Sequence, residues 1–279
     1  MPKIAASSYG ESSVRLLRVV RRGDRHDPHD LTVSCRFDGD FSPAFVDGRT
    51  DVLLPGEAVK NLVHTTALEA GAGEIETLAL AISDRVLSTQ AGVTRARIEI
   101  SERPWHRLEV GGKAQGQAFL SGSSERRTVT VTSNGEQTAV VSGIENLSMM
   151  RTSGFAPSRR ANEDPGGRHD RLQRLLVATL SARWTYLSAD VTFGPYRQAV
   201  RTAIVETLGC HGRRSVQHTL HAIADVVLTS VQEIIEITLV VQEHPYRPAD
   251  LFSAGMENPD DLFLILEEPR GVTEVTVER

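Results

Sequence analysis

The feature that most restricts how this chain can fold is a repeated order of secondary-structure patterns. The first half has the patterns of two strands, then two helices, then further strands. The second half has the same order without strong sequence identity to the first. Such a repeat indicates an internal structural duplication. Strand runs and helix pairs grouped in this way predict an α+β fold with antiparallel sheets and two tandem domains.

The first half carries these patterns in a regular succession. Residues 12–20 and 31–37 are rich in apolar residues and are expected to pair as a hairpin. Pro55 opens a helix that has Glu57 in its first turn. A second helix is predicted from apolar residues spaced three and four apart: Ile75, Leu78, Ile82 and Val86. Further strands are expected at 96–101, 127–132 and 138–142.

The second half repeats this succession. A helix is predicted over residues 199–208, with Gly209 as its C-terminal stop. Ser215 is expected to cap a second helix, whose apolar stripe runs from Val216 to Val227. Strands are expected at 184–193, 235–241 and 262–265.

We place the domain boundary near residue 135, which gives a first domain of residues 1–135 and a second of residues 136–279. The dipeptide Asn134-Gly135 marks this point, although the same dipeptide is equally typical of a tight hairpin turn. Residues 156–167 are polar and rich in Pro and Gly, and they are expected to form a loop or an interface arm.

Composition excludes several classes of function. The net charge of −5 gives no dominant basic field, so nucleic acid is not an expected partner. No apolar run is long enough for a membrane span, and neither a signal peptide nor a peroxisomal address is present. The two cysteines form neither a disulfide framework nor a metal spacing, which predicts a protein of the reducing cytoplasm without a metal site. The abundance of Arg, Ala and Val indicates a GC-rich bacterial genome.

Several short motifs occur in a characteristic order. Tyr9-Gly10-Glu11 is followed by Val14-Arg15, and Lys60-Asn61 lies in the first predicted helix. Ser215-Val216-Gln217 opens a helix of the second half. The C-terminal part contains the longest motifs: Gln242-Glu243-His244, Gly255-Met256-Glu257-Asn258-Pro259 and Glu268-Pro269-Arg270-Gly271. Together these motifs resemble the urate oxidase (uricase) family, and the resemblance covers nearly the whole chain.

The resemblance implies two tunnelling-fold (T-fold) domains per chain and a barrel-like homotetramer with active sites at subunit interfaces. It implies an enzyme without metal or organic cofactor, in which dioxygen is the co-substrate and the substrate itself reduces it. The positions that match the family's substrate-binding residues are Phe155, Arg174, Val216, Gln217 and Gln242. His244 matches a residue that handles protons.

Two positions depart from the family pattern. Glu11 stands where the family has its catalytic Lys, and Gly56 stands where it has its catalytic Thr. The pair Thr50-Asp51 lies six residues too early to restore the threonine without a rearranged loop. A positioned acid–base group contributes about 10²–10⁴-fold in rate, and a carboxylate that faces an anionic substrate repels it. We therefore predict that oxidation of urate is weak or absent.

Each matching residue also has an ordinary structural explanation. Arg174 lies away from the apolar side of a helix predicted from leucines at 172, 175, 176 and 180, which is typical of a surface residue. Gln217 belongs to a first helical turn, where side chains are usually solvated. Phe155 is of a type common in cores, and His244 at a strand end is of a type common in structural roles. Only their joint occurrence in the order of the family favours a site.

These observations leave three hypotheses. The first is a cofactor-free oxidoreductase redirected to a urate-like purine or related nitrogen heterocycle, with Glu11 and His244 as the proton-transfer pair. A carboxylate accepts paired N–H donors well, as from a guanine-like or pterin-like edge. The second is an inactive ligand-binding or scaffold protein of the same fold. The third is a genuine urate oxidase, giving 5-hydroxyisourate and hydrogen peroxide, with a relay through Thr50 or water.

Overall fold

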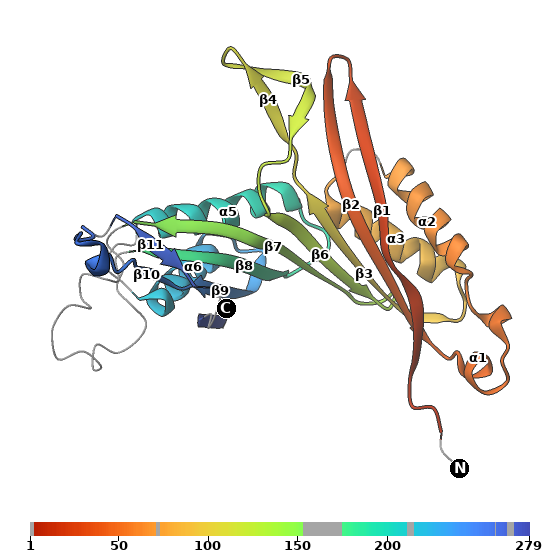
Figure 1. The fold of residues 1–279 in the computed structure, drawn as a ribbon. Coiled ribbons are helices and arrows are strands. Elements are labelled where there is room, and N and C mark those ends of the chain that lie inside the picture. Colours follow the sequence, from red (N-terminus) through yellow and green to blue (C-terminus); the bar gives the residue numbers. More distant parts are fainter. Residues whose placement is uncertain (1–2, 71–72, 153–174, 211–214, 260, 267–270) are drawn as a thin grey trace. The chain divides into compact units, whose positions relative to one another are not determined.

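The structure is a computed structural model that describes residues 3–70, 73–152, 175–210, 215–259, 261–266 and 271–279 (Figure 1). The chain forms two compact units. The first comprises Met1–Gly143 and Thr185–Gly194, and the second comprises Ile144–Trp184 and Pro195–Arg279. The predicted domain boundary near residue 135 stays a prediction. The segment around Asn134 is the turn between two strands, in which Asn134 Oδ1 accepts hydrogen bonds from the backbone N–H groups of Glu136 and Gln137.

The first unit has the predicted order of two strands, two helices and further strands. Its main elements are β1 (Ser7–Arg22), β2 (Arg25–Gly39), α2 (Gly56–Glu69), α3 (Ile75–Thr89), β3 (Val93–Arg103), β6 (Arg126–Ser133) and the part of β7 (Thr138–Arg151) up to Gly143. Smaller elements are α1 (Ser42–Val46), η1 (Thr50–Val52) and the hairpin β4 (His106–Val110) and β5 (Lys113–Leu120). The strand order is β1-β2-β3-β6-β7, and the pairs β1–β2, β2–β3 and β3–β6 are antiparallel.

Helices α2 and α3 cover one face of this sheet (Figure 1). The predicted stripe on α3 is confirmed, since Ile75, Ile82 and Val86 are all buried. It packs on alternating strand residues such as Ile98 and Ile100, which are also buried. The period of 3.6 on the helix and of 2 on the strand places both apolar sets in one core. The opposite face of the sheet therefore carries the polar side chains.

The second unit repeats the order. It contains β8 (Leu176–Tyr186), α5 (Phe193–Cys210), α6 (Val216–Ser230), β9 (Ile234–His244) and β12 (Gly271–Glu278), with β10 (Tyr246–Pro248), η3 (Phe252–Ala254) and β11 (Phe263–Ile265) near the C-terminus. The strand order is β7-β8-β9-β12, and β9 and β12 are antiparallel. Ser215 caps α6 as predicted, because its Oγ accepts the N–H of His218 at 3.3 Å.

Some predicted elements were wrong. The helix inferred from the leucines between 172 and 180 is, from Leu176 onward, strand β8, whose buried residues alternate. The strand-like character expected over 184–193 ends at Tyr186, and α5 begins at Phe193 and continues through Gly209. The strand at 262–265 exists as β11, but it pairs with β10 in a separate small sheet, and β12 is the second unit's last strand. Tertiary packing overrides such local patterns because intrinsic propensity is only a weak preference and Leu176 and Leu180 fit a strand period as well as a helical one.

None of the helices in the described part of the chain is both long and apolar enough to cross a membrane.

Candidate functional site

Glu11 and Gly56 lie side by side in the first unit. Glu11 belongs to β1 and is half-buried, and Gly56 is the first residue of α2. A β-carbon built on Gly56 would contact Glu11 Oε1 and would lie 3.0 Å from Glu11 Cδ. The carboxylate therefore fills the space that a side chain at position 56 would need. The two positions therefore form one local arrangement.

A bulge in β1 directly follows Glu11. The pairing of β1 with β2 shifts between Glu11 and Val14, and Ser13 has a positive φ of 59°. The N–H of Ser13, which leaves the regular ladder there, donates to Ser34 Oγ at 3.1 Å. Bulges of this kind re-aim the neighbouring side chains.

Tyr9 ties the segment before α2 to β1. Its Oη accepts the backbone N–H of Leu54 at 3.0 Å, and its ring makes edge contacts with Phe37 and Phe41 at 5.5 and 4.6 Å between centroids. Because Leu54 lies two residues before Gly56, this bond helps to place the start of α2 against β1. Nothing in the sequence pattern marked Tyr9 for this role.

The charges around Glu11 come from both elements. Burial, and then the charge of Glu11, raises the pKa of the Cys35 thiol to about 12. Cys35 is the cross-strand partner of Glu11 on β2. On α2, the Lys60 ammonium donates to Glu57 Oε1 at 2.7 Å, and this bond raises the pKa of Lys60, with a smaller contribution from Glu11. The carboxylates of Glu11 and Glu57 and the ammonium of Lys60 thus all lie at this end of α2.

In the second unit, His244 ends strand β9. Its Nε2 lies 2.9 Å from Thr179 Oγ1 on β8, within hydrogen-bond distance. His244 is half-buried, and Gln242, two residues earlier on the same face of β9, is exposed. The predicted pairing of His244 with Glu11 joins residues of different units and stays a prediction.

The predicted binding residues at the start of α6 differ in burial. Val216 is buried and lines a small cavity of about 20 Å³ together with Met149, Arg151 and Leu176. Gln217 is exposed. Phe155, Arg174 and residues 156–167 lie outside the described residues. The binding roles predicted for these positions stay predictions.

Beside the bulge, the open face of the first sheet forms a hollow of about 490 Å³. Its lining includes Glu11, Ser12, Ser34, Arg36 and Arg97. Thr50, named above as a substitute hydroxyl, lies in η1 and is exposed.

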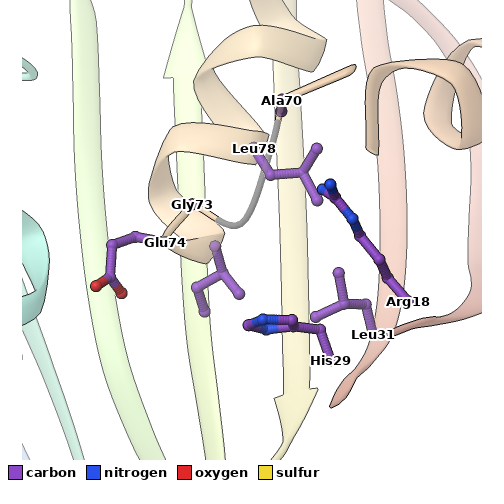
Figure 2. Close-up of a pocket in the computed structure, with 8 residues that line it drawn as sticks. Arg18, His29, Leu31, Ala70, Gly73, Glu74 and Leu78 are labelled. Atoms are coloured by element: carbon purple, nitrogen blue, oxygen red, sulfur yellow. The ribbon is translucent and has the colours of Figure 1, made fainter. Parts of the chain in front are cut away.

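A second polar cluster lies on the helix-covered side of the first unit. His29 Nδ1 is 2.8 Å from Oε1 of the buried Glu102, whose Oε2 accepts a hydrogen bond from Arg127 at 3.4 Å. His29 and Arg18 line a cavity of about 20 Å³, from which the Glu74 carboxylate points away (Figure 2). Arg18 donates to the carbonyl oxygens of Ala67 and Leu68 near the end of α2. These contacts join β1 to the end of α2, and they join β2 and β6 to β3.

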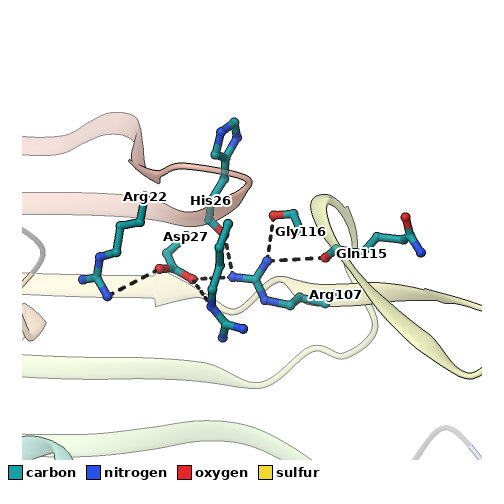
Figure 3. Close-up of polar contacts among 7 residues, drawn as sticks. Arg22, His26, Asp27, Arg107, Gln115 and Gly116 are labelled. Atoms are coloured by element: carbon teal, nitrogen blue, oxygen red, sulfur yellow. Dashed lines mark hydrogen bonds and ion pairs between the residues drawn. The ribbon is translucent and has the colours of Figure 1, made fainter.

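Arg107 of β4 holds the β4–β5 hairpin against the turn between β1 and β2 (Figure 3). Its guanidinium donates to the carbonyls of Gly116 at 2.8 Å and His26 at 2.5 Å and forms an ion pair with Asp27. The side chain is 16% exposed, and its Cζ lies 5.1 Å from the Phe119 ring centroid. One residue thus joins two hairpins.

Within the described ranges, no three or more His, Cys, Asp or Glu side chains come together in a way that could hold a metal ion.

Two units of strand–strand–helix–helix–strand–strand order, with antiparallel sheets, make the chain a tandem T-fold protein of the α+β class. The family model described as Uricase matches residues 7–132 and 140–276, which are almost the whole chain. The chain therefore belongs to the uricase family.

The chain is similar to individual relatives over nearly the whole length of both sequences. The chain is 28% identical to a uricase of Danio rerio over 98% of its own length and 94% of the relative's. It is 27% identical to a uricase of Arthrobacter globiformis over 99% of its length and 90% of the relative's. The crystal structure of uricase from Arthrobacter globiformis superposes with a TM-score of 0.87, at 27% identity, over 100% of this chain and 96% of that one. A uricase structure from a Bacillus species, at 15% identity and a TM-score of 0.79, shares the fold.

Proposed function

We propose that this chain is a cofactor-independent oxidoreductase that uses dioxygen to oxidise a urate-like purine or related nitrogen heterocycle, and that it turns over urate itself poorly. Membership of the uricase family supports the class of enzyme. The observation that supports redirection is the carboxylate of Glu11, which fills the space beside Gly56. Where the family resemblance implies an ammonium and a hydroxyl, this chain has a carboxylate and no side chain.

The physical argument rests on charge. A carboxylate near an anionic heterocycle in a partly desolvated site costs several kcal/mol or forces protonation of one partner. The same carboxylate accepts hydrogen bonds from a substrate edge that presents N–H groups. In this proposal Phe155, Arg174, Val216, Gln217 and Gln242 bind the heterocycle, and His244 and Glu11 transfer protons. The preferred substrate is a less anionic relative of urate.

The proposal includes the setting of the enzyme. It acts as a homotetramer with active sites at subunit interfaces, in a bacterial cytoplasm. The two cysteines, both free thiols in the structure, are consistent with a reducing compartment.

A second candidate is urate oxidation itself. It is favoured by the names of the relatives, which are uricases over nearly the whole length of this chain. In that case a group other than side chains at positions 11 and 56 completes the relay.

The test compares aerobic turnover of urate by the natural protein and by a Glu11→Lys/Gly56→Thr variant, following urate absorbance and hydrogen peroxide together. A Glu109→Lys variant controls for a charge reversal elsewhere in the first unit, since Glu109 is exposed on the β4–β5 hairpin and does not line the hollow beside Glu11. We expect little turnover by the natural protein and by the control, and at least about a hundredfold gain in the double variant, which restores a positioned acid–base group.

Each other outcome has a defined meaning. Robust turnover of urate by the natural protein would establish the second candidate and reject redirection. If neither protein turns over urate, the natural protein and Glu11→Gln are screened with guanine-like and pterin-like heterocycles for oxygen uptake and binding. Activity that depends on Glu11 supports the proposal. Absence of both oxygen uptake and binding would reject the proposal in favour of an inactive scaffold. Activity and binding that a Glu11→Gln change leaves unaltered would reject the role of Glu11.

A further inference from the structure

The contact between Thr179 and His244 joins neighbouring strands of the second unit. Nε2 of His244 and Oγ1 of Thr179 are 2.9 Å apart. Leu176, Ala178, Leu180 and Ala182 are the buried residues of β8, so Thr179 projects from the opposite face. Ile237, Leu239 and Val241 are buried on β9, so His244 projects from that same open face. Both side chains are half-buried.

The hydroxyl of Thr179 can control two properties of the His244 imidazole that matter for proton transfer: the orientation of the ring and its tautomer. A neutral imidazole has one nitrogen that donates and one that accepts, and the partner of the first nitrogen decides the state of the second. Here Thr179 engages Nε2, and within the described part of the chain no residue forms a hydrogen bond with Nδ1. The Thr179 bond thus fixes the ring in one orientation and leaves Nδ1 for a ligand or water on the open face.

We propose that Thr179 is a positioning residue, which sets the orientation and tautomer of His244 for proton transfer. This rests on the proposed function only in giving His244 a part in the reaction. If Nε2 accepts from the Thr179 hydroxyl, Nδ1 carries the hydrogen and acts as a donor. If Nε2 donates to Thr179, Nδ1 is the acceptor. In either case, loss of the Thr179 hydroxyl removes the preference of His244 for one tautomer.

The chain offers a well-matched set of variants. Thr179→Val removes the hydroxyl and keeps the β-branched shape that suits a strand. Thr179→Ser keeps the hydroxyl and removes the methyl group. Thr238 provides the control, because it lies on the same face of β9 as His244 and pairs with Thr276 Oγ1 at 2.9 Å. Thr238→Val therefore removes a similar hydroxyl contact that does not involve His244.

The first readout needs no turnover. Nitrogen-15 chemical shifts of the His244 ring, assigned with a His244→Gln variant, report the two tautomers at a pH of about 8.5, where an unperturbed imidazole is neutral. We expect one dominant tautomer in the natural protein, Thr179→Ser and Thr238→Val, and a mixture of both in Thr179→Val. An unchanged tautomer ratio in Thr179→Val would overturn the positioning role, whatever the enzyme proves to do.

The second readout is kinetic. It uses urate as substrate and whichever protein oxidises it, the natural chain or Glu11→Lys/Gly56→Thr. Thr179→Val should lower kcat about tenfold or more, with KM changed less than about twofold, because a misplaced proton-transfer group acts on the chemical step and not on binding. Thr179→Ser should restore kcat, and Thr238→Val should leave it unchanged. Equal kcat in Thr179→Val and Thr238→Val would overturn the proposal. If no protein turns over urate, the tautomer ratio alone decides the role of Thr179.

Discussion

The carboxylate of Glu11 stands in the place that a side chain on Gly56 would occupy: Glu11 Cδ lies 3.0 Å from the position of a β-carbon there, and Glu11 Oε1 lies nearer still. Glu11 is on β1, and Gly56 is the first residue of α2. A side chain on Gly56 would require this carboxylate, which is the end of a flexible side chain, to move aside. The two positions are therefore expected to behave as one unit under mutation.

This coupling predicts a non-additive mutant cycle. Gly56→Ala should lower the free energy of unfolding by about 0.5–1.5 kcal/mol, because the added methyl group displaces the Glu11 carboxylate from its present rotamer. In a Glu11→Ala background the same change should be neutral or should stabilise by up to about 1 kcal/mol, because the space is then empty and alanine restricts the unfolded chain. Urea unfolding of the four proteins measures the coupling. Gly209→Ala serves as control, because a β-carbon there meets nothing within 4 Å. Additive effects within about 0.5 kcal/mol would contradict the steric relation.

Cys35 is expected to be unreactive while the protein is folded. Its pKa is raised to about 12, first by burial and then by Glu11. The fraction of thiolate, which is the reactive form, is therefore small at pH 8. Iodoacetamide should modify Cys35 on the order of a thousandfold more slowly than the exposed Cys210. Peptide mass spectrometry measures the two rates, and comparable rates would show that Cys35 is not shielded.

The same raised pKa gives a pH dependence of stability with a definite sign. The folded state holds the thiol proton more tightly than the unfolded state, in which the pKa of the thiol is near 9.0. The corresponding stability is complete below about pH 9 and is lost as pH rises from there toward about 12. A Cys35→Ala variant should lose less stability across this window than the natural protein does. Melting curves at several pH values compare the two slopes, with Cys210→Ala as the control.

Glu102 is expected to make a large contribution to the stability of the first unit. Its side chain is 7% exposed and contacts both His29 and Arg127. Glu102→Ala should lower the free energy of unfolding in urea by about 1–3 kcal/mol. The substitution removes the buried carboxylate, and His29 and Arg127 each lose their contact with it. Glu99→Ala, on the same strand but exposed and paired with Arg97, should change stability by less than about 0.5 kcal/mol. Equal losses in both variants would mean that burial of Glu102 adds nothing.

Arg107 is expected to control the β4–β5 hairpin locally. Arg107→Ala removes the donors to Gly116 and His26 and the ion pair with Asp27. Amide hydrogen exchange should accelerate in residues 106–120 by about tenfold or more, while exchange in the core of the first sheet stays unchanged. Arg107→Lys should restore only part of the protection, since an ammonium cannot reproduce the fork of donors. Lys113→Ala, an exposed change on the same hairpin, is the control. Unchanged exchange in Arg107→Ala would rule out this role.

The sequence by itself determined the order of elements in both units, because amphipathic periodicity is a local property. The stripe on α3 and the alternation along β3 and β9 identified buried faces without knowledge of their partners. The prediction from periodicity failed at β8, because Leu176 and Leu180 are also compatible with a helical spacing and the small Ala178 between them does not mark a strand. The motifs were enough to identify the family, and the comparisons confirm it.

The relations that give the candidate site its chemistry were decided only by the tertiary structure. Sequence named Glu11 and Gly56 as separate replacements, but their contact depends on how β1 meets the start of α2. It named His244 but not Thr179, because no pattern along one strand reveals which residue of the next strand lies opposite. Periodicity is set by the geometry of the backbone within one element. Contacts between side chains far apart in sequence are set by the register and packing of several elements together, and only the folded chain fixes these.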